Sequence, residues 1–265
     1  DELLMGTILP DVIKAAGGVI LLCSPRMATL FQDAFPAATV IAADDKPKDG
    51  GLLAGVAFQA SLSELGRQLR PTMGSFVPSP GYLKPNQDLA AKLRANYLQN
   101  RAGAPLVGIS WRSRNPNSEP EKSMSLADLG AVLKVPGVTF VSLQYGDCAA
   151  EIAETNRTLG TSIIFDPSVD PLKDMSAFAA QTAAMDLVIS VSNTTVHTAA
   201  AVGRTTWAMI PANRGRMWYW FLERTDSPWY QNMRLFRASP TDKWKPAVAG
   251  VAAALVEWTK AGAPR

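Results

Sequence analysis

The sequence predicts an α/β protein with two doubly wound parallel sheets, of which the N-terminal one is abbreviated. Short apolar runs rich in β-branched residues alternate with helical segments along the chain. The clearest unit, residues 186–211, reads D-L-V-I-S-V-S-N-T-T-V-H-T-A-A-A-V-G-R-T-T-W-A-M-I-P and predicts strand, tight turn, helix and strand. A loop over 71–85 with four prolines and a break over 101–105 interrupt the alternation. We therefore predict two domains, over 1–100 and 101–265.

The elements of the first half are short. Apolar residues at positions 3, 4, 8, 9, 12 and 13 predict a helix over 2–16, which Pro10 kinks or splits and a Gly-Gly pair ends. Ser61, with Glu64 three residues on, is typical of a helix start and predicts a helix over 61–69. The other expected elements are strands over 19–23, 39–43 and 52–58 and helices over 25–35 and 86–100.

The second half repeats the alternation more regularly. Ser125 and Asp174 precede helical patterns, as N-cap residues do. The expected strands cover 106–111, 138–143, 162–165, 187–191, 206–210 and 234–236. The expected helices cover 125–133, 149–159, 175–184, 197–202 and 244–260. Strands that alternate with helices in this way form a parallel sheet.

The turn over 192–195 is the strongest candidate for a binding site. It follows a buried strand, so it lies at the carboxyl edge of the sheet, where ligands of open α/β folds bind. The helix that follows begins with backbone N–H groups that lack intrahelical partners, and an anion fits there. Asn193, Thr194 and Thr195 could add donors to a phosphate or could simply cap the helix. His197, the single histidine of the chain, falls in the first turn of that helix and is a candidate ligand contact.

Composition excludes several classes of protein. The 265 residues are 47% hydrophobic, with a net charge of +3 that is scattered rather than gathered in a basic stripe, so nucleic acid is not an expected partner. Cys23 and Cys148 suggest neither a disulfide framework nor a zinc site, and we expect a cytoplasmic protein. No apolar run is long enough for a membrane span, and no signal peptide opens the chain. Because the chain begins at Asp1, we expect it to be part of a longer polypeptide.

Common nucleotide and catalytic motifs are missing from the sequence. It contains no G-x-G, no G-x-x-x-x-G-K-[ST] and no G-x-S-x-G, which lowers the expectation of dinucleotide binding, P-loop hydrolysis and α/β-hydrolase chemistry. One histidine and two scattered cysteines do not make a common zinc site. These patterns predict a cleft between two α/β domains. The cleft is expected to contain an anion site and no metal.

Several segments resemble one family of glycosyltransferases. The stretch over 186–204 is similar to the D-x-x-I…H-L-A-G-A-L-G segment of heptosyltransferase-like proteins. The same likeness extends, in the same order, to V-G-I-S-W-R-S-R-N-P (107–116), K-S-M-S-L (122–126), F-V-S-L-Q-Y-G-D (140–147) and S-P-W-Y-Q-N-M-R-L-F-R (227–237). The closest resemblance is to the module that follows tetratricopeptide repeats in many bacterial proteins.

This resemblance implies a GT-B fold, with two facing Rossmann-like domains, and glycosyl transfer from a nucleoside diphosphate sugar without a catalytic metal or another cofactor. It implies that the donor diphosphate is held by Asn193, Thr194, Thr195 and His197, with Ser192 in the same turn. It further implies contacts to phosphates or sugar from Arg112, Ser113 and Lys122, and contacts to base and ribose from Gln144, Asp174 and Met175. Asp1 matches the N-terminal Asp that acts as base on the acceptor hydroxyl.

Two departures from the family pattern keep alternatives open. Ser192 stands where heptosyltransferases have an Asp, which favours a sugar other than ADP-heptose. The first half is shorter than a full acceptor domain, so acceptor recognition is expected to involve upstream tetratricopeptide repeats. A protein such as flagellin, or a glycan, is the expected acceptor. The alternatives are a GT-B binding module that docks a partner without catalysis, and a sugar-nucleotide epimerase.

Overall fold

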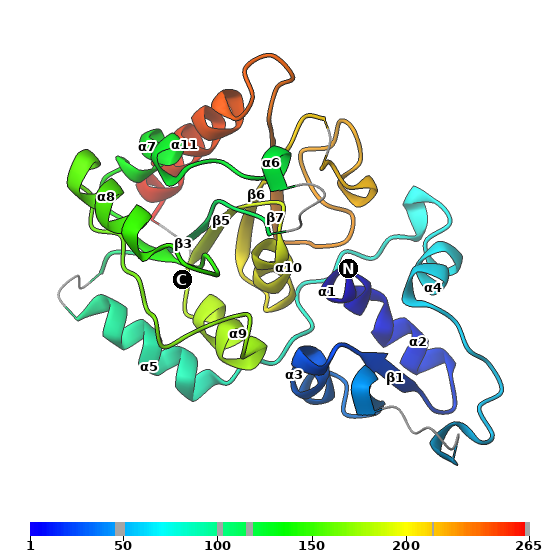
Figure 1. Cartoon of the computed structure of the whole chain (residues 1–265). Coiled ribbons are helices and arrows are strands. Elements are labelled where there is room, and N and C mark those ends of the chain that lie inside the picture. The colour runs from blue at the N-terminus through cyan, green and yellow to red at the C-terminus, as the bar shows by residue number, and fades with distance from the viewer. Residues whose placement is uncertain (46–50, 100–102, 115–118, 214, 263–265) are drawn as a thin grey trace.

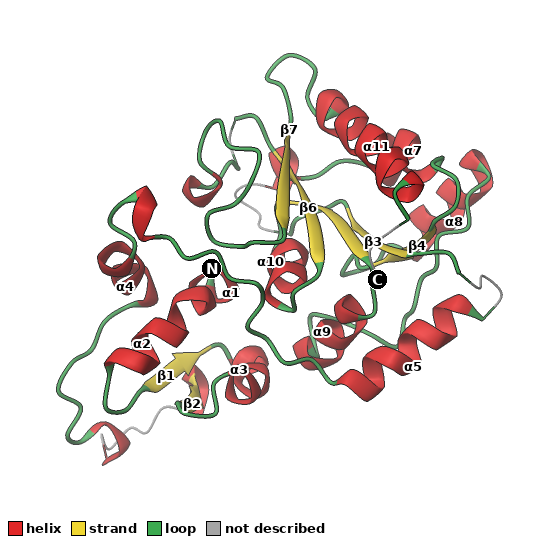
Figure 2. Ribbon diagram, turned by 180° about the vertical axis from the view of Figure 1, so that it is seen from behind, coloured by secondary structure: helices red, strands yellow, loops and turns green. Residues whose placement is uncertain are grey.

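A computed structural model describes residues 1–45, 51–99, 103–114, 119–213 and 215–262 (Figure 1). Its two sheets are both parallel, one of five strands and one of two. The prediction of an α/β protein with two parallel sheets, the first one smaller, is confirmed. Figure 2 shows the small sheet at the end of the molecule that carries the N-terminal helices.

The larger sheet has the strand order β4-β3-β5-β6-β7, and every neighbouring pair is parallel. Its strands are β3 (Leu106–Ser110), β4 (Thr139–Ser142), β5 (Leu187–Val191), β6 (Thr205–Ile210) and β7 (Met233–Arg237). The chain passes from β3 to β4 on one side and then returns to β5 on the other side of β3. The carboxyl ends of β3 and β5 therefore flank a topological switch point, where open α/β sheets bind ligands.

Helices cover both faces of this sheet (Figure 1). One face carries α7 (Gly130–Leu133), α8 (Ala149–Leu159) and α11 (Lys245–Lys260); the other carries α5 (Gln87–Leu98), α9 (Met175–Ala183) and α10 (Thr194–Ala201). Leu187 and Ile189 of β5 pack in the cluster that includes α8 and α11, whereas Val188 packs with α9. Because both faces are covered, β5 is apolar or small at every position and fully buried.

The smaller domain is built from short elements: α1 (Glu2–Met5), α2 (Leu9–Ala15), β1 (Ile20–Cys23), α3 (Ala28–Ala34), β2 (Thr39–Ala42) and α4 (Leu62–Leu69). A 3-10 turn over Gly6–Ile8 separates α1 from α2, and Pro10 lies in the first turn of α2, so the predicted break of the first helix is confirmed. Ser61 caps α4 by accepting a hydrogen bond from the Glu64 amide.

Two predicted strands are wrong. Residues 52–58 form a 3-10 turn over Gly51–Leu53 followed by irregular chain, and Phe58 is 93% exposed, so no neighbouring strand covers this segment. Residues 162–165 reduce to one parallel bridge between Ile164 and Val141. A short helix, α6 (Glu119–Lys122), forms where none of the predicted elements lies. Position 100, the expected end of the helix over 86–100, lies outside the described residues.

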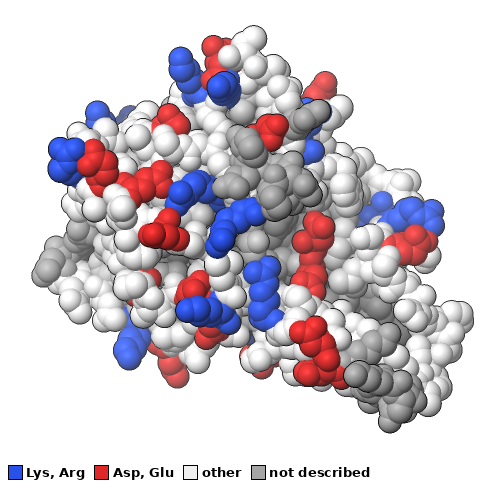
Figure 3. Space-filling model, in the orientation of Figure 1, with Lys and Arg blue, Asp and Glu red and all other residues white. Residues whose placement is uncertain are grey.

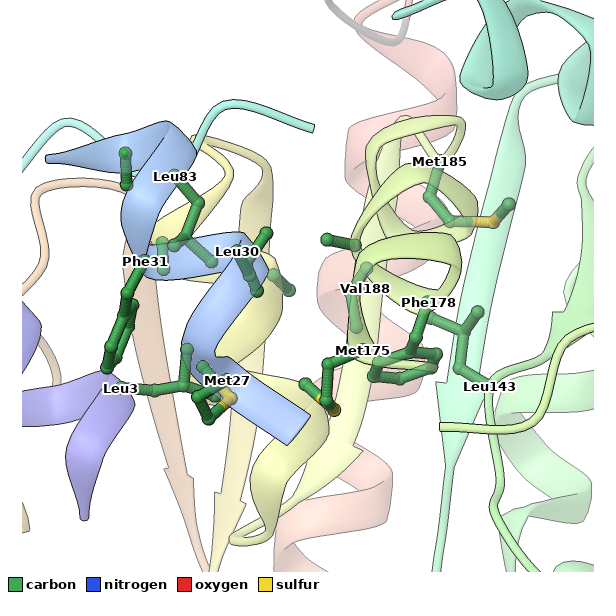
Figure 4. Packing of buried hydrophobic residues seen from close by; sticks show 14 of the residues in the cluster. Leu3, Met27, Leu30, Phe31, Leu83, Leu143, Met175, Phe178, Met185 and Val188 are labelled. Carbon is green, nitrogen blue, oxygen red and sulfur yellow. The ribbon is translucent and has the colours of Figure 1, made fainter. Parts of the chain in front are cut away.

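The two domains share a hydrophobic core. In Figure 4, Met27 and Leu30, from the turn before α3 and from α3 itself, lie across from Met175 and Phe178 of α9. The connecting segment is hydrogen-bonded to α10, since the amides of Tyr82 and Leu83 both donate to the carbonyl of Ala201. Helix α1 of the smaller domain also packs directly against α10 of the larger domain.

Helix α5 precedes the predicted boundary at residue 100 but packs on the larger domain. Ala90 contacts Ala180 and Ala183 of α9, and the Arg94 guanidinium donates to the carbonyl of Ala184. The boundary itself stays a prediction. Within the described ranges, no helix combines the length and the apolar character needed to cross a membrane.

Candidate functional site

A pocket of about 360 Å³ lies at the carboxyl edge of the larger sheet, beside the switch point between β3 and β5. The smaller domain contributes Asp1, Glu2 and Arg26, and the larger domain contributes the turns after β3, β4 and β5 together with α9 and α10. Figure 3 shows basic and acidic side chains side by side across the middle of this face of the molecule. The pocket is an interdomain site whose lining includes Arg26, Arg114 and Lys122 as well as Asp1 and Glu2.

Asn193 fixes the turn that opens α10. Its side-chain Oδ1 accepts from the Thr195 amide at 2.9 Å and from Ser190 Oγ at 3.1 Å. Its Nδ2 donates to Ser110 Oγ at 2.8 Å and to the Arg112 carbonyl at 2.9 Å. All the polar atoms of this side chain are thus used to cap the helix and to join β5 to β3. In this turn, the groups that a ligand can contact are therefore the amino end of α10, which Asn193 caps, and the Thr194 side chain.

Lys122 is a buried cation in this pocket, with 6% of its surface exposed. Desolvation lowers the pKa of its ammonium group. It makes no hydrogen bond or ion pair with any residue in the described part of the chain. Gly215 packs directly over its side chain, since a Cβ added there would lie 2.9 Å from Lys122 Cγ. A partly desolvated ammonium without a carboxylate partner among the described residues favours a bound anion.

His197 is enclosed by aromatic rings. Its imidazole stacks on Trp220, with ring centroids 5.3 Å apart, and meets Tyr219 edge-on at 5.4 Å. Its Nδ1 lies 3.2 Å from the Tyr230 hydroxyl. Burial lowers the pKa of the imidazole to about 3, with smaller contributions from nearby positive charges that include Lys122. The ring is therefore neutral at physiological pH and can act through Nε2 as a hydrogen-bonding group, not as a cation.

Ser192 and Trp220 form the wall behind His197. The indole Nε1–H of Trp220 donates to Ser192 Oγ at 2.7 Å, and both residues are buried. The departure from Asp to Ser at this position thus coincides with a tryptophan that bonds the hydroxyl. This fixes the Ser192 oxygen as an acceptor and leaves its proton available to the pocket.

The first turn of α1 is anchored to the end of β1. Both carboxylate oxygens of Glu2 accept hydrogen bonds at 2.6 Å from Ser24, one from its amide and one from its hydroxyl. Asp1, the N-cap residue of α1, is exposed and lines the pocket. The Tyr82 hydroxyl donates to the carbonyl of Leu3 and holds the same turn from the other side. These bonds fix the place of Asp1 opposite α10.

The structure brings most of the predicted site residues together. The predicted residues that line the pocket are Asp1, Ser113, Lys122, Met175, Ser192, Asn193, Thr194 and His197. The pocket also contains residues that the sequence analysis missed: Arg26, Arg114, Tyr145 and Tyr219. Arg26 follows the carboxyl end of β1, and Tyr145 follows the carboxyl end of β4. Their position just after a predicted strand could have identified both as candidate site residues.

The other four predicted residues, Arg112, Gln144, Asp174 and Thr195, do not line the pocket. Gln144 Oε1 accepts from Ser110 Oγ and from the amides of Trp111 and Arg112, so it closes the turn after β3. Asp174 caps α9 by accepting from two amides. Thr195 is fully buried, and its hydroxyl has no partner among the described residues. These side chains hold the frame of the site, and donor contact by them stays a prediction.

Arg112 turns away from the pocket along α8. Its guanidinium donates to the Asp147 carbonyl at 3.0 Å and pairs with Glu151 at 3.4 Å. Glu151 also accepts from the indole of Trp111 and from the amide of Leu126. The described residues contain no group of three His, Cys, Asp or Glu side chains that could hold a metal ion.

These two parallel sheets, with a pocket between them at the strands' carboxyl ends, make up the GT-B fold of glycosyltransferases. A glycosyl transferase family 9 protein of Veillonella parvula superposes with a TM-score of 0.63 at 9% identity, covering 98% of this chain and 93% of that one. The ADP-heptose LPS heptosyltransferase II of E. coli gives 0.62 at 11% identity, with 99% and 95% covered. E. coli heptosyltransferase WaaC with ADP gives 0.52 at 14% identity, with 98% and 94% covered.

In sequence, the chain is similar to Protein FlbA of Caulobacter vibrioides, with 32% identity over 269 aligned residues. The alignment covers 96% of this chain but 44% of FlbA, so the chain spans less than half the length of that relative. No family model matches the sequence.

Proposed function

We propose that this chain transfers a glycosyl group from a nucleoside diphosphate sugar to a hydroxyl of an acceptor. The observation that carries the proposal is the largely buried side chain of Lys122, whose ammonium has no partner within the described residues and lines the same pocket as the amino end of α10. A diphosphate is the chemistry that both features suit, because it is anionic and accepts hydrogen bonds. The fold, shared with family 9 glycosyltransferases, supports the same class of ligand.

Departure of the nucleoside diphosphate is the step that these residues would assist. As the bond from the anomeric carbon to the diphosphate oxygen breaks, negative charge grows on that oxygen. Lys122 and the free amides of α10 would stabilise this charge, and one well-placed donor is worth roughly 3 kcal/mol of barrier. Neutral His197 would donate a hydrogen bond from Nε2 in the tautomer whose Nδ1 accepts from the Tyr230 hydroxyl. In this scheme no metal is required, and that independence stays a prediction.

Asp1 is the proposed general base. Asp1 lines the pocket from the opposite domain, on a turn that the Glu2–Ser24 bonds hold in place. It would accept the proton of the acceptor hydroxyl as the acceptor oxygen forms its bond to the anomeric carbon. With the base on one domain and the leaving-group site on the other, the reacting carbon would lie between them.

Neither sugar nor acceptor follows from the fold alone. The E. coli relative in the comparison is named for ADP-heptose, whereas the Ser192 oxygen of this chain is bonded to Trp220. We therefore propose a donor sugar other than heptose. The acceptor is proposed to be a protein such as flagellin, or a glycan, recognised together with tetratricopeptide repeats of a longer polypeptide.

A donor screen tests this function directly. Calorimetric titration with UDP-, GDP-, CMP- and ADP-sugars should identify one class of nucleotide that binds, and acceptor-dependent release of that nucleotide should continue in EDTA. Asp1→Asn should reduce transfer by about 10²-fold or more while nucleotide affinity stays unchanged. If no nucleotide sugar binds, transferase function is excluded and a docking role takes its place. Nucleotide release without acceptor would contradict transfer to a hydroxyl of that acceptor.

A further inference from the structure

A second cavity, of about 780 Å³, lies at the opposite edge of the larger sheet. Its lining includes Pro105, Asp186 and Arg204, which immediately precede β3, β5 and β6. The candidate donor pocket lies at the carboxyl ends of the same strands. Since β5 has five residues and a strand rises about 3.3 Å per residue, the two sites are on the order of 15 Å apart.

Charge is unbalanced in this cavity. It is lined by two guanidinium groups, Arg94 and Arg204, and by one carboxylate, Asp186. Arg94 Nη2 pairs with Asp186 Oδ2 at 2.9 Å, and the same oxygen accepts from the Leu106 amide at 2.7 Å. Arg94 Nη1 donates to the Ala184 carbonyl at 2.7 Å. The single carboxylate is therefore engaged with one arginine and with the start of β3, and a positive charge is left without a partner in the described part of the chain.

Arg204 carries that charge. Its Nε is buried and has no hydrogen-bond partner among the described residues, and its guanidinium forms no ion pair with any of them. Burial and the neighbouring Arg94 lower the pKa of this group, whereas Asp186 raises it. The Arg204 backbone is fixed, because its amide donates to the Ala199 carbonyl and its own carbonyl accepts from the Asn232 and Thr206 side chains. A guanidinium presented in this way has unused donors in a planar fork, the geometry that binds phosphate oxygens.

Glycines keep the rim of the cavity open. Gly103, Gly137 and Gly262 all line it, with φ of 86°, 81° and 70°, and a Cβ added to any of them would meet no atom of the described residues within 4 Å. The cavity also falls within the size range of small-molecule sites, roughly 300–1,000 Å³. There is room for a molecule larger than a bare ion.

We propose that this cavity binds a phosphorylated small molecule, with the phosphate held by Arg204 beside Arg94. The site is independent of the proposed donor pocket, since none of its lining residues belongs to that pocket. Inorganic phosphate is the simplest probe for it.

Phosphate binding can be separated from the donor pocket by variants at each site. In Lys122→Met, where the donor pocket has lost its buried cation, phosphate should still raise the unfolding temperature above that in chloride of equal ionic strength, and calorimetry should still detect one bound phosphate. In Arg204→Gln this remaining binding should fall by about tenfold or more. Loss of all phosphate binding in Lys122→Met would overturn the proposal and assign phosphate to the donor pocket alone.

A second pair of variants does not depend on Arg204. Gly137→Asp introduces a carboxylate at the rim, in a backbone conformation that Asp and Asn tolerate better than most residues, and should weaken phosphate binding in the Lys122→Met background by about tenfold. Gly137→Asn is the uncharged control of nearly equal shape and should bind phosphate as before. Equal binding by Asp and Asn variants would show that phosphate does not occupy this cavity.

Discussion

The imidazole of His197 lies almost parallel to the indole of Trp220, at an interplanar angle of 13° and a centroid separation of 5.3 Å. The same indole donates to Ser192, so one tryptophan supports two residues of the pocket wall. Stacking on an aromatic face removes water from the imidazole, which disfavours its charged form. The arrangement explains why the histidine expected to hold a diphosphate is neutral in the fold.

Stability should therefore fall with acidification through His197. Its folded pKa of about 3 lies below the unfolded value near 6.5, so the unfolded state binds the proton first as pH falls. The stabilisation is complete above about pH 6.5 and is lost as pH falls towards 3. Between about pH 7.5 and 5, the free energy of unfolding should drop by about 2 kcal/mol more in the native chain than in His197→Gln. Urea unfolding at both pH values measures this, and equal drops would mean that His197 is protonated in the fold.

Trp220 and Trp229 form a matched test of one hydrogen bond. Both are buried tryptophans, but Trp220 Nε1 donates to Ser192, whereas Trp229 Nε1 has no partner among the described residues. Replacement by Phe removes similar volume from each. Trp220→Phe should lower the free energy of unfolding by about 1–2 kcal/mol more than Trp229→Phe, because it leaves a buried hydroxyl unpaired. Denaturant titration compares the two, and the opposite order would contradict the assigned bond.

Lys122→Met should separate binding from stability. The variant removes a partly desolvated ammonium that has no partner among the described residues, so the unliganded fold should become more stable by on the order of 1 kcal/mol. Affinity for the nucleotide sugar should fall by about tenfold or more. The control is Lys134→Met, at an exposed position where α7 ends, which should change neither quantity appreciably. If Lys122→Met binds donor normally, the ammonium is not a phosphate ligand.

Gly81 is required where the interdomain segment crosses the end of α10. Its φ is +125°, and an added Cβ would lie 2.7 Å from both Cα and N of Gly203. Gly81→Ala should therefore lower the free energy of unfolding by on the order of 3 kcal/mol, from backbone strain and steric overlap together. Gly17→Ala is the control, since nothing lies within 4 Å of its added Cβ. Thermal unfolding of both variants tests this contact. Equal losses of stability in the two variants would show that Gly81 and Gly203 are not in contact.

Glu2 should affect turnover more than donor binding. Glu2→Gln weakens the two bonds from Ser24 that hold the first turn of α1, and with it the position of Asp1. We expect kcat to fall by about tenfold while the KM for the nucleotide sugar stays near its native value, because Lys122 and α10 are untouched. Steady-state kinetics at saturating acceptor makes the measurement. A change in KM alone would place Glu2 in donor binding instead.

Local sequence predicted much of this protein, because the features concerned depend on residues close together in the chain. The N-caps Ser61, Ser125 and Asp174 accept hydrogen bonds from amides two or three residues ahead, as expected. The turn after β5 and its short helix were also predicted, as was the parallel sheet that follows from regular alternation of strands and helices. These features fix the carboxyl edge of the sheet as the place for a site.

Only the tertiary structure decided which side chains reach that site. Gln144 follows a strand end, as a ligand residue would, yet it is turned towards donors 32 to 34 positions earlier in the chain. Arg26 enters the pocket because the 3-10 turn Pro25–Met27 that contains it packs against α9, and Asp186 pairs with Arg94 but not with Arg204. The physical reason is that backbone periodicity is set by near neighbours, whereas the partner of a polar side chain is set by whichever distant group packing brings within bonding distance.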